Sequence, residues 1–309
     1  MTGILIRDLV SFDDLSQVPG VEREVWGVSE RDIIPITLAV ANQAAGSIWI
    51  GAFEGAKLVG FAFAFLGSED GRLTVHSHQL AVLPSYRDLD LGYKLKLAQR
   101  DRVLAMRIEN PYAQQFRSND SRLSCLRIEE ITWTFDPLQS KNAHFNFVKL
   151  GAVSGRYKVD FYGAETSSTL HRNGTDRLWV RWILDSRRVQ SRLQGHDKRA
   201  EMLDALANVA PLVRFNGEGK PARGDLSAAL GRQRIAIEIP SDIAAVEKND
   251  AALAAEWRQA TRWAFTSALR SGFFVAEFCR AVRGQQGPGV YLLEKGSLEE
   301  FIPELARGK

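Results

Sequence analysis

The segment from residue 80 to residue 92 constrains this chain of 309 residues more than any other part of it. An apolar strand end, Leu80-Ala81-Val82, runs into Pro84, which has no N–H to offer to a strand ladder. A basic helix then begins near Leu91. A turn that opens directly into a helix presents unpaired backbone N–H groups at the positive end of the helix dipole, which suits a diphosphate. The alternative is an ordinary strand–turn–helix junction.

The same segment resembles the acyl-CoA pyrophosphate loop of the GNAT superfamily of N-acyltransferases, [Arg/Gln]-x-x-Gly-x-[Gly/Ala] after a strand that ends in Ala-Val-x-Pro. Arg87 and Gly92 are in register with that pattern, whereas Asp90 stands where the family usually has its first glycine. A negative side chain therefore lies on the expected path of the pyrophosphate. The resemblance implies acetyl-CoA as co-substrate, bound by Leu80, Ala81, Val82, Arg87, Asp88, Leu89, Asp90, Leu91, Gly92 and Tyr93.

A second stretch occurs in the order that this family requires. Residues 131–135 alternate and are β-branched or aromatic, which predicts a strand, and a helix over 143–149 should end at Gly151. The stretch resembles the GNAT element Asn-x-x-Ala…Tyr-x-x-x-Gly-Phe. The resemblance implies that Asn142 meets the pantetheine arm. Phe147 occupies the position of the tyrosine that often protonates the departing thiolate, and it has no proton to give.

The order of elements predicts an α+β fold, a GNAT-type mixed and mostly antiparallel central sheet flanked by helices. We expect residues 1–185 to form a GNAT-like acyl-CoA-binding domain and residues 186–309 a C-terminal α+β extension. Strand, helix, strand, strand over 234–239, 251–269, 273–282 and 289–293 repeats the second half of such a domain. That extension is either a degenerate half GNAT or an unrelated addition. Residues 217–224 read as a loop, and residues 107–127 read as an insertion. The expected elements of the first domain are strands 4–9, 49–53, 57–66, 73–82, 156–162 and 177–184, and helices 21–27, 33–45 and 91–105.

Three residues are candidates for the chemistry. Transfer of an acetyl group to an amine needs a neutral amine, hence a base or a water relay. His76 and His78 lie two apart on the strand over 73–82 and share one face, and histidine has an unperturbed pKa of about 6.5. Tyr157 could replace the phenol that is missing at Phe147. For each of the three, a packed and hydrogen-bonded core residue is the alternative.

Composition narrows the partners and the compartment. The chain has 40 basic and 37 acidic residues, a net charge of +3, and this near balance does not suggest binding to nucleic acid. Two cysteines, Cys125 and Cys279, form neither a disulfide framework nor a metal-ligand pattern. No apolar run approaches the roughly 18–20 residues of a membrane span, and no secretory leader is recognisable. We therefore expect a cytoplasmic protein without metal or membrane partner, and a homodimer is possible.

Two functions are compatible with these observations. One is an acyltransferase that moves an acetyl group from acetyl-CoA to an amine. The other is a non-catalytic acyl-CoA-binding or sensing protein, which the departures at Asp90 and Phe147 favour.

Overall fold

The computed structural model describes residues 3–69, 72–109, 125–163, 168, 172–195, 206, 209–280 and 287–302. The chain forms two compact units. The first contains Met1–Trp133 with Ser167–Leu170, and the second contains Thr134–Thr166 with His171–Lys309. The domain boundary expected after residue 185 falls inside the second unit, so that the two expected domains stay a prediction.

The first unit contains a mixed sheet with the strand order β1-β2-β3-β4-β7. Strands β1 to β4 pair antiparallel, whereas β4 and β7 run parallel and pair only through Val75 with Ile131 and His76 with Thr132. Two further strands, β5 and β6, form a separate small sheet. The strands are β1 (Ile4–Asp8), β2 (Ile48–Glu54), β3 (Lys57–Glu69), β4 (Arg72–Val82), β5 (Ile108–Glu109), β6 (Cys125–Leu126) and β7 (Glu130–Phe135).

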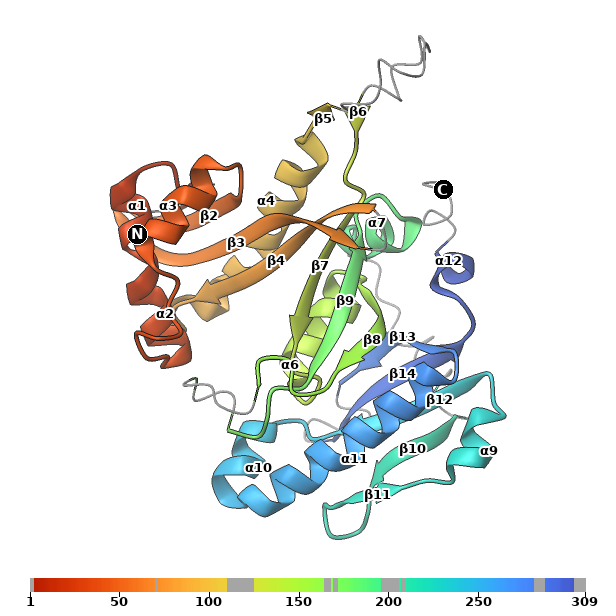
Figure 1. The fold of residues 1–309 in the computed structure, drawn as a ribbon. Coiled ribbons are helices and arrows are strands. Elements are labelled where there is room, and N and C mark those ends of the chain that lie inside the picture. Colours follow the sequence, from red (N-terminus) through yellow and green to blue (C-terminus); the bar gives the residue numbers. More distant parts are fainter. Residues whose placement is uncertain are drawn as a thin grey trace, which may run out of the picture. The chain divides into compact units, whose positions relative to one another are not determined.

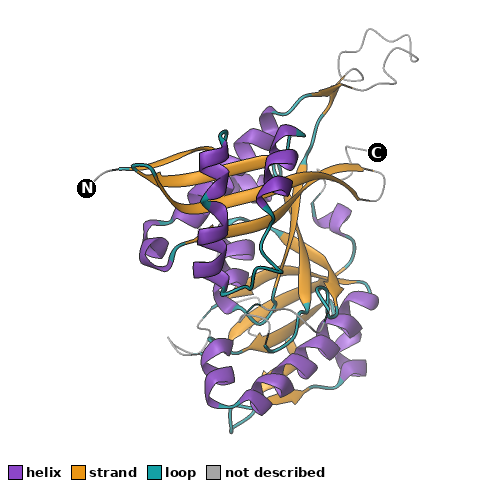
Figure 2. Ribbon diagram, turned by 60° about the vertical axis from the view of Figure 1, so that its left-hand side comes forward, coloured by secondary structure: helices purple, strands orange, loops and turns teal. Residues whose placement is uncertain are grey.

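Helices cover both faces of this sheet (Figure 2). Helix α2 packs on the face of the alternating phenylalanines of β3, where the Trp26 and Phe61 rings are 6.2 Å apart. Helix α4 packs on the other face, where Lys96 contacts Ser77 of β4. The helical segments are α1 (Phe12–Ser16), α2 (Val18–Trp26), α3 (Ile36–Ala44), the 3₁₀ helix η1 (Pro84–Leu89) and α4 (Leu91–Ala105).

The second unit contains a sheet with the order β9-β8-β13-β14-β12-β10-β11, and the end of β7 lies beside β9. The long helix α11 lies along these strands (Figure 1) and buries Trp257, Ala260, Ala264, Phe265 and Ala268 at helical spacing. The strands are β8 (Val153–Lys158), β9 (Arg177–Ile183), β10 (Ala210–Phe215), β11 (Pro221–Arg223), β12 (Arg234–Ile239), β13 (Phe273–Cys279) and β14 (Gly289–Lys295). The helices are α6 (Ser140–Ala143), η3 (His144–Lys149), α7 (Arg187–Leu193), α9 (Leu226–Leu230), α10 (Ile243–Asn249), α11 (Ala251–Arg270) and α12 (Leu298–Phe301).

The second unit repeats one strand arrangement. Strand β14 lies between β12 and β13, as β9 lies between the end of β7 and β8. Strand β10 runs parallel to β12, as β4 runs parallel to β7. This arrangement favours the half-copy interpretation of the C-terminal extension. The copy lacks a diphosphate loop in its described part, because β10 continues into the antiparallel strand β11 rather than into a helix.

Several local expectations need correction. Strand β8 begins at Val153 and ends at Lys158 rather than covering 156–162, because Asp160 adopts a left-handed turn conformation with φ 45°. Strands β10 and β11 were not expected, and β11 lies inside the presumed loop 217–224. Of the expected insertion, residues 110–124 lie outside the described residues. In the part of the chain that the structure describes, no helix has the length and apolar character needed to cross a bilayer.

Candidate functional site

The junction between β4 and α4 is a strand end, a short 3₁₀ helix and an α-helix in direct succession. Leu80, Ala81 and Val82 form the end of β4 and pair with β3. The turn η1 follows, and Asp90 then adopts the left-handed conformation with φ 57° and ψ 23° before α4 begins. Glycine adopts this conformation without steric cost, whereas an L side chain is strained in it. The backbone therefore explains why the GNAT pattern has glycine where this chain has Asp90.

The start of α4 fits a diphosphate in three respects and opposes it in one. The N-cap residue Asp90 makes no side-chain capping hydrogen bond at the start of α4. Gly92 leaves open space, since an added Cβ would meet only Leu80 Cδ2 at 3.9 Å. Arg87 is an exposed cation beside the helix start. The exposed carboxylate of Asp90 opposes an anion at the same place.

The remaining loop residues divide by burial. Asp88 and Leu89 are exposed, and Tyr93 is half-buried. Leu91 is fully buried, so its side chain belongs to the core and only its backbone is available to a ligand.

The pairing of β4 with β7 ends at His76 and Thr132, and a buried lysine lies beside Ser77 and Trp133, the next residues of the two strands. Lys96 Nζ donates to Ser77 Oγ at 2.7 Å and to Gln99 Oε1 at 3.2 Å, and lies 3.8 Å from the centre of the Trp133 ring. Burial lowers the pKa of Lys96 well below its usual value. We did not predict this residue from the sequence, although Lys96, Gln99 and Val103 follow the helical spacing of a buried stripe.

The two candidate histidines lie on one face of β4, as their spacing predicts. A bulge places His78 between the paired positions Ser77 and Gln79, and both imidazoles contact Phe65, at 5.6 Å for His76 and 6.0 Å for His78. His76 Nδ1 lies 3.0 Å from Thr132 Oγ1.

Both histidines are neutral near pH 7. Burial, and then the positive charges of His78 and Lys96, lower the pKa of His76 to about 4. Partial removal of water by the surrounding side chains also lowers the pKa of His78, although part of that residue remains exposed. The sequence alone suggests an ordinary histidine pKa for His76. The pKa in the folded protein is lower because burial removes water from the charged imidazolium.

The other predicted site residues belong to the second unit. Asn142 is exposed on α6. Phe147 is fully buried, with its ring 5.8 Å from that of Tyr291. The Tyr157 hydroxyl donates to Asp176 at 2.6 Å, and burial together with this carboxylate raises the pKa of Tyr157 well above its usual value. Tyr157 is therefore a protonated phenol whose hydroxyl hydrogen is used in the bond to Asp176.

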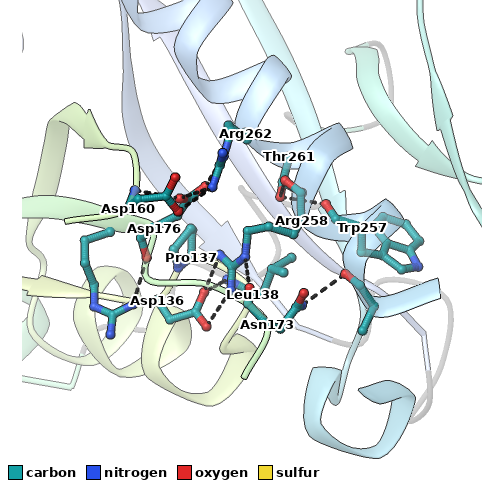
Figure 3. Close-up of polar contacts among 12 residues, drawn as sticks. Asp136, Pro137, Leu138, Asp160, Asn173, Asp176, Trp257, Arg258, Thr261 and Arg262 are labelled. Carbon is teal, nitrogen blue, oxygen red and sulfur yellow. Dashed lines mark hydrogen bonds and ion pairs between the residues drawn. The ribbon is translucent and has the colours of Figure 1, made fainter. Parts of the chain in front are cut away.

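Asp176, which accepts from the Tyr157 hydroxyl, belongs to a network of paired charges in the second unit (Figure 3). Arg258 of α11 donates to both carboxylate oxygens of Asp136 at 2.8 Å, and its Nε donates to the Asn173 carbonyl at 2.8 Å. Arg262, one turn along α11, donates to Asp176. Burial disfavours the charged guanidinium of Arg258, but the Asp136 carboxylate more than offsets this and raises the pKa of Arg258. These groups have their partners within the unit and read as structural.

Metal ligation finds no support in the described residues, where no group of three His, Cys, Asp or Glu side chains lies close enough to hold a metal ion.

Comparisons with known proteins complete this description. No family model matches the chain, and no curated protein matches it. Solved structures that resemble it are acetyltransferases. The ribosomal-protein-S18-alanine N-acetyltransferase of Escherichia coli is 12% identical, with a TM-score of 0.40 over 59% of this chain and 94% of its own. Naa50 of Arabidopsis thaliana, in complex with a bisubstrate analogue, is 17% identical, with a TM-score of 0.40 over 58% and 97%. The PaiA N-acetyltransferase of Thermoplasma acidophilum, in complex with coenzyme A, is 19% identical, with a TM-score of 0.35 over 59% and 99%.

Proposed function

We propose that this protein is an acyltransferase that moves an acetyl group from acetyl-CoA to an amine. The observation that carries the proposal is the β4–η1–α4 junction, where an uncapped helix start, Gly92 and Arg87 converge at the end of a strand. Acetyl-CoA would supply an activated thioester carbon, at which the amine nitrogen forms a C–N bond while the C–S bond breaks. The helix start and Arg87 would hold its diphosphate. Asn142, which lies in the second unit, stays a prediction from the resemblance.

His76 is the proposed proton acceptor in this reaction. It lies at the last paired position of β4 with β7, its ring is positioned by Thr132, and its lowered pKa of about 4 makes it mostly neutral from pH 5 upward. A neutral imidazole can accept the proton that the attacking amine loses. His78, on the same face and more exposed, is the second choice. Tyr157 is the least suited of the three, because its hydroxyl already donates to Asp176.

One of the two departures from the family pattern favours the alternative function, acyl-CoA binding without transfer. Asp90 places a carboxylate at the proposed diphosphate site, and Phe147 is a buried core residue that cannot protonate a thiolate. Phe147 weakens catalysis alone, whereas the Asp90 carboxylate would weaken diphosphate binding in either function.

Release of the CoA thiol in the presence of primary amines distinguishes the two functions. The acyltransferase predicts that thiol release from acetyl-CoA depends on the amine and follows its concentration to saturation. Binding of acetyl-CoA without amine-dependent thiol release across a panel of alkylamines, amino acids, aminoglycosides and lysine peptides would instead select the sensing function.

A further inference from the structure

Buried polar atoms without partners gather on one face of the first unit's sheet. Among the described residues, six buried side-chain atoms have no hydrogen-bond partner, and four of them are Glu22 Oε2, Trp49 Nε1, Thr74 Oγ1 and Gln79 Oε1. Strand alternation and pairing put Trp49, Thr74 and Gln79 on the face of Phe63 and Phe65, the face on which α2 places Glu22. A buried polar group without a hydrogen-bond partner destabilises the folded state, so such a gathering requires an explanation.

Glu22 and Gln79 form the centre of this gathering. Glu22, on α2, is completely buried. Its Oε1 accepts from Gln79 Nε2 at 2.8 Å and from the Ile34 N–H at 3.4 Å, while its Oε2 accepts nothing. The two unsatisfied atoms of the pair, Glu22 Oε2 and Gln79 Oε1, are both acceptors. What the pair lacks is therefore a group with several N–H or O–H donors.

We propose that the Glu22–Gln79 pair is a subsite that binds a protonated nitrogen of the amine acceptor. An alkylammonium carries a positive charge and three N–H donors, which matches a carboxylate oxygen and an amide oxygen side by side. Burial of the carboxylate raises the pKa of Glu22 above its usual value, as expected for a carboxyl group that lacks its cation. The assignment rests on the proposed acyl transfer for its meaning, but the binding itself does not require acetyl-CoA.

The position of the pair suits this role. Gln79 is half-buried and next to the exposed His78, so the pair lies just below the surface of β4. With the bulge at His78, Gln79 is two strand positions from His76 on the same face, a separation of about 7 Å. A nitrogen held by Glu22 would thus lie near the proposed proton acceptor.

The competing arrangement needs no ligand. A proton on Glu22 Oε2 could be donated to Gln79 Oε1, which would close a carboxylic acid–amide pair with two hydrogen bonds. That arrangement satisfies both atoms internally and predicts that the pair does not respond to amines.

Titration with a matched pair of probes tests the proposal. The protein is labelled with 15N-tryptophan, the Trp49 indole signal is assigned through Trp49→Phe, and n-butylammonium or 1-butanol is added at pH 7 without acetyl-CoA. We expect n-butylammonium to shift the Trp49 indole signal, and Glu22→Gln to weaken its affinity by about tenfold or more. Gln79→Met should weaken it as well. Glu24→Gln, an exposed carboxylate on the same helix, should have no effect, and 1-butanol should not discriminate between wild type and Glu22→Gln.

Equal n-butylammonium affinity in wild type and Glu22→Gln, or no shift of the Trp49 indole in wild type, would overturn the proposal in favour of the internal acid–amide pair. The thermal melting of Glu22→Gln, with and without acetyl-CoA, separates this result from folding and from acyl-CoA binding. If the wild-type protein binds n-butylammonium but not acetyl-CoA, the proposed function is refuted and the ammonium subsite is retained.

Discussion

Arg258→Met is expected to lower the free energy of unfolding by about 3–5 kcal/mol, the cost of leaving one partner of a buried ion pair without its counter-charge. The Arg258 side chain is 4% exposed and that of Asp136 11%, so that water cannot replace the lost guanidinium. The Asp136 carboxylate then keeps the hydrogen bond that it accepts from the Leu138 N–H at 2.9 Å. Urea unfolding monitored by tryptophan fluorescence measures the loss of stability, and thermal unfolding in a calorimeter provides a second measurement.

A double variant and a surface variant control this experiment. Arg258→Met combined with Asp136→Asn removes both charges, keeps an acceptor for Leu138 and should recover most of the lost stability. Arg23→Met breaks an ion pair between exposed residues, Arg23 and Glu30, and should leave unfolding almost unchanged. If Arg258→Met unfolds at the same urea concentration as Arg23→Met, the ion pair has no structural role.

His76→Ala should reduce amine-dependent acetyl transfer by about 10²–10⁴-fold with little change in acetyl-CoA affinity, because it removes a positioned base. Since the pKa of His76 is about 4, the wild-type enzyme should keep its base in working form throughout pH 5–8. Any rise of activity with pH in that range then reports the substrate amine rather than His76. Steady-state kinetics of both proteins from pH 5 to 9 provide the comparison.

The folded state of wild type should also gain stability relative to His76→Ala as pH rises from 4 to 6.5. In the unfolded chain this histidine has an ordinary pKa of about 6.5, whereas its pKa in the folded protein is about 4. Between these two pH values the unfolded state binds more protons, so lowering the pH favours unfolding. A His76→Ala protein with normal turnover would move the assignment of the base to His78. One that loses acetyl-CoA binding as well would identify His76 as a packing residue.

Local patterns predicted the elements around the site because local chemistry determines them. The Pro84 stop after an apolar run marks the end of β4, and the spacing of leucines marks α4, which ends at Ala105 as expected. Strands β10 and β11 escaped prediction for the same local reason, since Pro211 and Pro221 read as strand breakers. Strand β11 tolerates Pro221 because it is the edge strand of its sheet. Strand β10 tolerates Pro211 because this residue precedes the part of β10 that pairs with β11 and lies at an irregularity in the pairing with β12.

The polar pairings could not be predicted in this way. Asp136 and Arg258 are 122 residues apart, and Glu22 and Gln79 are 57 apart. Local sequence patterns give no information about which of two such distant residues will come into contact. The burial of Lys96 is an intermediate case, because helical spacing places it on the inner stripe of α4, but a lysine in such a stripe is ordinarily assigned to solvent.

Calorimetric titration of acetyl-CoA into wild type and Asp90→Gly tests the central claim most directly. We predict saturable binding by wild type, and tighter binding by Asp90→Gly by on the order of 1 kcal/mol, about fivefold, because glycine removes an exposed negative charge and suits the left-handed backbone. Tightening specific to acetyl-CoA would locate the diphosphate at the start of α4. Absence of saturable binding in both proteins would contradict the claim that this chain uses acetyl-CoA.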